Sequence, residues 1–91
     1  MSNVLMAKQL QQLRTEVAGG HIAIEEAYRA FERLTYELVD LRPDDDPRLR
    51  ELTNEIELIR FTQLPEDQAA AVGEVMERAQ RVFDELAERS C

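Results

Sequence analysis

Residues 19–41, GGHIAIEEAYRAFERLTYELVDL, contain a double-glycine break followed by an apolar stripe. The stripe repeats at steps of three and four residues and comprises Ile24, Ala27, Phe31, Leu34, Leu38 and Leu41. This spacing places all six side chains on one face of a helix. We expect a core helix that ends at Leu41-Arg42-Pro43, because the residue before a proline is disfavoured in helical geometry.

Three other segments show the same spacing and predict three further helices. They extend from about Asn3 to Val17, from Pro47 to about Phe61 and from about Pro65 to Glu88. Ser2 or Asn3 is expected to cap the first of these helices. Asp46 is expected to cap the helix that follows it, with Pro47 at the first helical position. Gly73 lies inside the last segment, where it indicates either a close approach of two helices or simple tolerance.

The connections between the expected helices are short, and no segment alternates apolar and polar residues as a strand does. Short loops require consecutive helices to run antiparallel to one another. The sequence therefore predicts an all-α fold, an up-down-up-down four-helix bundle. With 91 residues the chain has room for one core, so residues 1–91 are expected to form a single domain.

The composition, with 44% hydrophobic and 33% charged residues, is that of a globular protein. No apolar run approaches the roughly 20 residues that a membrane span needs. The N-terminus shows no secretory signal, and the single cysteine, Cys91, cannot form an internal disulfide. These features lead us to expect a cytoplasmic protein with no membrane association and an incidental terminal thiol.

The residue types that carry catalysis are sparse and poorly spaced. His21 is the only histidine, so the Glu-x-x-His pairs of di-iron bundles cannot be formed. Residues 44–46 are three consecutive aspartates, whereas a calcium loop needs alternating acids, a central glycine and a closing glutamate. Gly19-Gly20 lacks the lysine of a phosphate-binding loop. We therefore expect no enzymatic activity, no cofactor and no metal.

The acidic residues are unevenly distributed along the chain. Residues 1–39 hold five acids and four bases, whereas residues 40–91 hold fourteen acids and seven bases, within a total net charge of −8. Such a surface repels nucleic acid and membranes and attracts a basic protein, although solubility alone also favours acidic surfaces. The residues predicted to contact this partner are Asp40, Asp44, Asp45, Asp46, Glu51, Glu55, Glu66 and Asp67.

Part of the chain resembles the immunity proteins of the colicin D type, helical bacterial proteins that block a tRNA-cleaving toxin. The matching features are Gly20, Ile22 and Glu26 in a G-x-I-x-x-x-E pattern, the aromatic residues Tyr28 and Phe31 that follow, and a helix start at residues 64–66, LPE. The resemblance implies an inhibitor whose carboxylates occupy the basic substrate cleft of a cognate nuclease toxin. Ala23 replaces the family's usual Ser cap, and the turn carries an extra glycine.

Two other interpretations use apolar surface: a homo-oligomeric module would use it instead of charge, and a regulatory adaptor would use both. Leu5, Val39, Leu58 and Phe61 lie off the main apolar stripes and are candidates for one interaction face. Such a face would serve a homo-oligomeric structural or assembly module, including a homodimer, or a regulatory adaptor without catalytic activity. The eight acidic residues span loops expected at opposite ends of the bundle, so the third helix must connect them if they form one patch.

Overall fold

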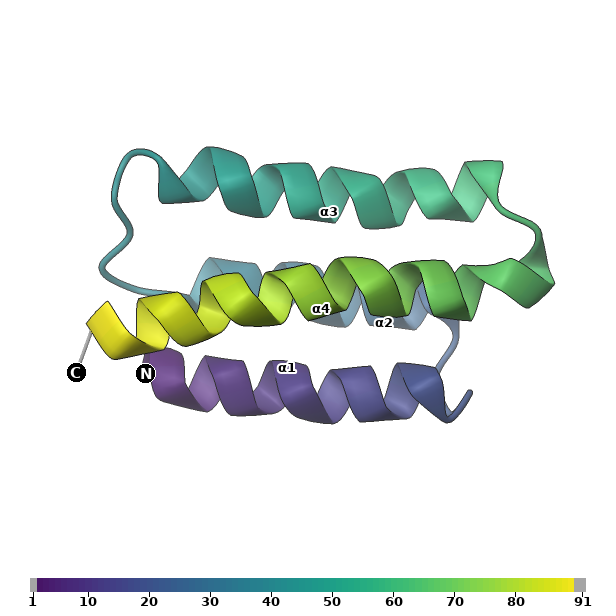
Figure 1. Ribbon diagram of the computed structural model, residues 1–91, viewed down its shortest axis with the longest axis horizontal. Helices are drawn as coiled ribbons and strands as arrows, with labels where there is room; N and C mark the ends of the chain where they lie inside the picture. The colour runs from purple at the N-terminus through teal and green to yellow at the C-terminus, as the bar shows by residue number, and fades with distance from the viewer. Residues whose placement is uncertain (1, 90–91) are drawn as a thin grey trace.

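The computed structural model describes residues 2–89 and contains four helices packed as an antiparallel bundle (Figure 1), which confirms the predicted fold class. The helices are α1 (Asn3–Ala18), α2 (Ile24–Glu37), α3 (Asp45–Thr62) and α4 (Pro65–Arg89). Cys91 lies outside the described residues, so the expectation about its thiol is not addressed.

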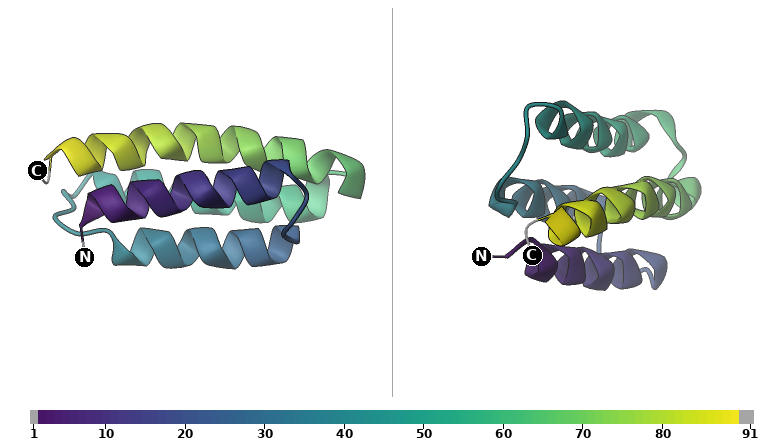
Figure 2. Two further views of the ribbon diagram at one scale, coloured as in Figure 1. Left: turned by 90° about the horizontal axis from the view of Figure 1, so that it is seen from below. Right: turned by 60° about the vertical axis from the view of Figure 1, so that its left-hand side comes forward.

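The direction of the chain alternates from helix to helix, as short connections require. In Figure 1 α4 lies between α1 and α3, with α2 behind, and Figure 2 shows α3 on the opposite side of α4 from α1. The α2–α3 loop lies at the same end of the bundle as the N-terminus, and the α3–α4 connection lies at the other end. This topology determines which surface residues can act together.

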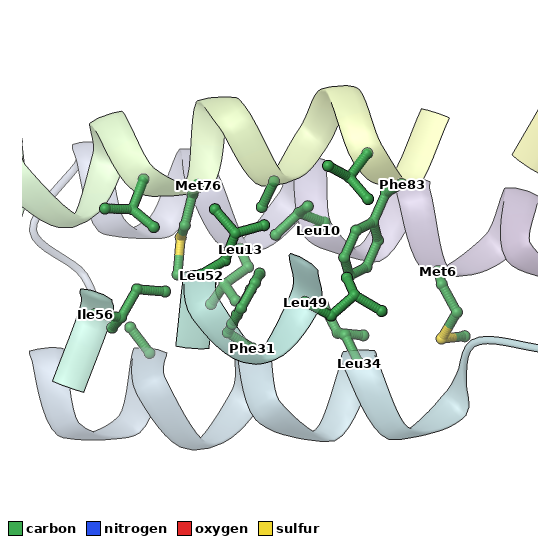
Figure 3. Close-up of a cluster of buried hydrophobic side chains, with 14 of the residues drawn as sticks. Met6, Leu10, Leu13, Phe31, Leu34, Leu49, Leu52, Ile56, Met76 and Phe83 are labelled. Atoms are coloured by element: carbon green, nitrogen blue, oxygen red, sulfur yellow. The ribbon is translucent and has the colours of Figure 1, made fainter. Parts of the chain in front are cut away.

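The core is built from the apolar stripes of all four helices (Figure 3). Its largest members are Phe31 of α2 and Phe83 of α4, both fully buried, with ring centroids 6.0 Å apart. Met6 and Leu10 of α1 and Ile56 of α3 are also fully buried around them. Burial of each such side chain contributes about 1.5–3 kcal/mol relative to exposure, so these contacts stabilise the arrangement of the helices.

The first helix begins and ends as the sequence predicts. Ser2 caps its start by accepting a hydrogen bond from the Leu5 N–H, which confirms one of the two proposed caps. At its end, the Gly20 N–H donates to Val17 and the His21 N–H donates to Glu16, a pattern that satisfies carbonyls of the last turn. Gly20 adopts φ +70°, a conformation that glycine tolerates without strain.

The second helix ends at Glu37, so the prediction that it continues to Leu41 is wrong. Leu38 leaves helical geometry with ψ 143° and Asp40 has φ 57°. Between them, the Val39 N–H donates to the Asn3 side chain at 2.9 Å, while the Asn3 amide donates to the Val39 carbonyl at 2.8 Å. Asn3, 36 positions away in the chain, therefore satisfies both backbone groups of Val39 in place of helical hydrogen bonds.

The third helix begins at Asp45 rather than at Pro47, so Asp46 is not its cap. Asp44 precedes the helix and makes no side-chain capping bond. The Asp45 carboxylate instead accepts a hydrogen bond from the Arg42 N–H at 2.8 Å. Pro47 is accommodated because N–H groups of a first helical turn have no intrahelical acceptor.

Gly73 of α4 does not mark a close approach between helices. A Cβ atom built on this residue has no heavy-atom neighbour within 4 Å, and the position borders a shallow hollow between α1 and α4. The structure therefore supports tolerance of glycine rather than a packing requirement.

We predict that Gly73→Ala stabilises the protein by about 0.5–1 kcal/mol, because alanine loses less backbone entropy in a helix and meets no steric obstacle here. The free energy of unfolding from urea titration measures this change. Gly20→Ala is the matched control and should destabilise, since Gly20 has positive φ. Destabilisation by Gly73→Ala would contradict the assignment.

Candidate functional site

Negative charge is concentrated on α4 more than on any other helix. This helix carries seven acidic and three basic residues, whereas α3 carries five and three and α2 carries four and two. The first helix has one acidic and two basic residues and is the only one with net positive charge among the four. Negative charge is therefore greatest on α4, and α2 and α3 carry equal, smaller net negative charges.

Seven of the eight predicted partner-binding residues lie at least partly at the surface, and Asp45 does not. Asp45 is 2% exposed. Its carboxylate accepts hydrogen bonds from the Arg42 N–H and the Arg89 guanidinium, and Arg48 lies 3.8 Å away. This side chain joins the α2–α3 loop to the end of α4 and is engaged within the protein, so it is removed from the contact set.

Two more of the predicted residues already have a cationic partner. Asp46 pairs with Arg50 one turn along α3 at 2.7 Å, with both side chains largely exposed. Glu55 accepts two hydrogen bonds from Arg78 of α4, at 2.6 and 3.1 Å. The exposed Asp46–Arg50 pair is weak, so Asp46 can exchange its partner. The bidentate Glu55–Arg78 pair fixes α3 against α4.

The remaining predicted residues do not form one continuous patch. Asp40 and Asp44 lie in the α2–α3 loop, while Glu66 and Asp67 begin α4 at the opposite end of the bundle (Figure 1). Of the acidic residues on α3, Glu51 is exposed and has no ion-pair partner within residues 2–89. Glu51 is therefore the member best placed to connect the two groups.

The centre of the α3–α4 face is an arginine surrounded by carboxylates. Hydrogen bonding to Glu55 raises the pKa of Arg78, and the charges of Glu74 and Glu51 add to this effect. The Glu55 carboxylate is paired with this guanidinium, whereas Glu51 and Glu74 have no ion-pair partner within residues 2–89. Next to it lies a shallow hollow of about 180 Å³, lined by Arg48, Glu51, Leu52, Glu55, Arg78 and Val82.

Several acidic residues of α4 were not among the predicted contacts. Glu74, Glu77, Glu85 and Glu88 are all exposed on the side of α4 away from its buried stripe. Their exposure follows from the sequence, because they occupy the helical positions between the members of the apolar stripe.

A second hollow, of about 280 Å³, lies between α2 and α3. The side chains lining it include Tyr28, Glu32 and Tyr36 from α2, and Asp46, Arg50 and Thr53 from α3. Burial and the nearby Glu32 charge raise the pKa of Tyr28, whose hydroxyl donates to the Glu32 carboxylate at 3.3 Å. Tyr28 is therefore a hydrogen-bond donor here, not a base.

The four apolar residues proposed for an interaction face are exposed, but they occupy two separate places. Leu5 is in the first turn of α1 and Val39 is in the α2–α3 loop, both at the end of the bundle that holds the N-terminus, and each is 40% exposed. Leu58 and Phe61 lie near the C-terminal end of α3, at the opposite end. A single face made of all four residues does not form.

No family model matches the chain, and no curated protein or solved structure gives a significant match. None of the described helices combines the length and apolar character that crossing a bilayer requires. Within residues 2–89, no three side chains of His, Cys, Asp or Glu gather closely enough to hold a metal ion.

We predict that Asp45→Ala lowers the free energy of unfolding by about 2–3 kcal/mol, because it leaves the Arg42 N–H and the Arg89 guanidinium without their charged acceptor. Asp46→Ala is the matched control and should cost no more than about 0.5 kcal/mol, since it removes an exposed pair. Chemical denaturation followed by circular dichroism measures both. Equal effects of the two substitutions would contradict the role assigned to Asp45.

Asp45 also makes stability depend on pH. The Arg42 N–H, followed by the Arg89 side chain, lowers the pKa of this carboxyl in the folded state. Its stabilising contribution is therefore present above the unfolded pKa of about 3.9 and is lost as pH falls through the lower folded pKa.

We predict that the stability difference between the wild type and Asp45→Asn is constant from neutral pH to about pH 5 and shrinks below about pH 4. Thermal melts across this range measure it. A difference that grows on acidification would contradict the assignment.

Proposed function

We propose that this protein is a non-enzymatic binding protein that recognises a basic protein partner through its α3–α4 face. The observation that carries the proposal is a set of exposed carboxylates on α3 and α4 that have no ion-pair partner within residues 2–89: Glu51, Glu66, Asp67 and Glu74. Lysine or arginine side chains of a partner would pair with these carboxylates.

The more specific form of this proposal is an immunity protein for a tRNA-cleaving toxin. It is supported by the resemblance at Gly20, Ile22 and Glu26 to the colicin D type of immunity protein. A nuclease that holds tRNA needs a basic cleft for phosphates, and exposed carboxylates on a rigid helical face can occupy such a cleft. The protein would then inhibit by competing with tRNA for the cleft.

The charge-recognition step predicts selective effects of charge reversal. Glu51→Lys and Glu74→Lys should each lower the association rate with a lysine-rich helical peptide by roughly three- to tenfold at low salt, because both reduce electrostatic steering. Stopped-flow fluorescence measures this rate. The reduction should diminish at high salt as charges are screened.

Glu26→Lys is the matched control for that experiment. Glu26 is exposed on α2. Ala30, one turn further along the same helix, lines a hollow between α2 and α1, so Glu26 lies toward α1. The substitution changes the net charge by the same amount at a site away from the α3–α4 face. Association rates that fall equally for all three variants would show a net-charge effect and would contradict a specific face.

The inhibitory role has a separate test. The gene product encoded beside this chain is co-expressed with it, and cleavage of tRNA is measured with the wild type and with Glu51→Lys/Glu74→Lys. Suppression of cleavage by the wild type and its relief by the variant would support the immunity role. A neighbouring product that does not cleave RNA, or cleavage unaffected by this protein, would contradict that role and leave the charge-recognition proposal standing.

A further inference from the structure

The C-terminal end of α3 exposes an unusual amount of apolar surface. Leu58 is 58% exposed, Phe61 is 73% exposed, and Leu64 in the connection to α4 is 61% exposed. We call these three residues the α3 apolar end. Leu58 and Phe61 are three positions apart on one helix, so their side chains are neighbours on its surface. Contiguous exposed apolar side chains of this kind mark interaction sites more often than scattered ones do.

The side chain next to Phe61 connects the end of α3 to α2. The Arg60 guanidinium lies 5.6 Å from the centre of the Phe61 ring and 5.5 Å from the centre of the Tyr28 ring on α2. Arg60 also lies 4.0 Å from Glu25. The Phe61 ring itself is 73% exposed and is open to contact with a partner.

Carboxylates border the α3 apolar end on both sides along the chain. Glu51 lies two turns before Leu58 on the same side of α3, and Glu66 and Asp67 follow Leu64 at the start of α4. All three carboxylates are exposed and have no ion-pair partner within the described part of the chain. The surface therefore combines an apolar centre with an acidic border.

We infer that the α3 apolar end anchors an amphipathic segment of the basic partner. Apolar side chains of that segment cover Leu58 and Phe61, and its lysine or arginine side chains pair with Glu51, Glu66 and Asp67. The inference rests on the proposed function, from which the basic character of the partner comes. It adds the source of binding energy: the carboxylates speed association, and burial of Phe61 slows dissociation.

Charge complementarity favours this occupant over a second copy of the chain. Each copy has a net charge of −8, and a symmetric dimer built on this surface would bring identical carboxylate borders close together. Like charges at an interface oppose association. A segment with basic residues around an apolar centre satisfies both parts of the surface.

The test uses two fluorescent helical peptides with the same number of lysines. One has leucines on the face opposite the lysines, and the other has glutamines at those positions. Fluorescence anisotropy at physiological salt gives the dissociation constant of each with the full-length protein. We expect the leucine peptide to bind the wild type roughly tenfold tighter than the glutamine peptide, and Phe61→Ser to abolish most of this ratio.

Tyr36→Ser is the matched control. Tyr36 is a 79% exposed aromatic residue near the end of α2, at the other end of the bundle. This variant should keep the peptide ratio of the wild type. Both substitutions replace exposed side chains, so unchanged melting temperatures will verify that the fold is intact.

The outcomes separate this inference from the proposed function. A wild type that binds both peptides equally, or a Phe61→Ser variant that preserves the ratio, overturns the inference alone. Glu51→Lys should weaken both peptides and leave a clear preference for leucine, and the absence of weakening counts against the proposed function. Failure of both peptides to bind overturns the inference and the proposed function together.

A dimer in sedimentation experiments that Phe61→Ser dissociates would identify a second copy as the occupant and overturn the inference.

Discussion

The packing of Phe31 against Phe83 lies at the centre of the bundle and joins α2 to α4, which are not consecutive in the chain. Both rings are fully buried, and side chains from α1 and α3 close around them (Figure 3). Burial of the apolar stripes of the four helices fixes how each helix is rotated about its own axis. That rotation determines which charged residues face solvent, so the positions of the exposed carboxylates on α3 and α4 are a consequence of the core.

Two buried polar side chains complete the arrangement at one end. Asn3 holds both backbone groups of Val39, and Asp45 receives hydrogen bonds from Arg42 and Arg89. Together they connect α1, the α2–α3 loop, α3 and the end of α4. A buried polar group stabilises a structure only when its hydrogen bonds are satisfied. These residues therefore specify the path of the loop, and the aspartate-rich segment serves structure as well as surface charge.

The exposed surface offers two kinds of interaction. Carboxylates without an ion-pair partner, such as Glu51 and Glu74, act over several ångströms in water and would speed encounter with the proposed basic partner. Exposed apolar groups such as Phe61 act only on contact and would slow dissociation of the proposed complex.

The all-α bundle, the four helices and most of the core are predictable from residue order, because period-3.6 apolar stripes and short loops leave few other arrangements. The concentration of acidic residues after residue 39 is likewise evident from residue order. Packing between helices, in contrast, ends α2 at Glu37, buries Asp45 and pairs Glu55 with Arg78. Each of these outcomes depends on a contact between residues distant in the chain or between separate elements. Local patterns report which face of a helix is apolar, but not which partner a polar side chain meets across the bundle.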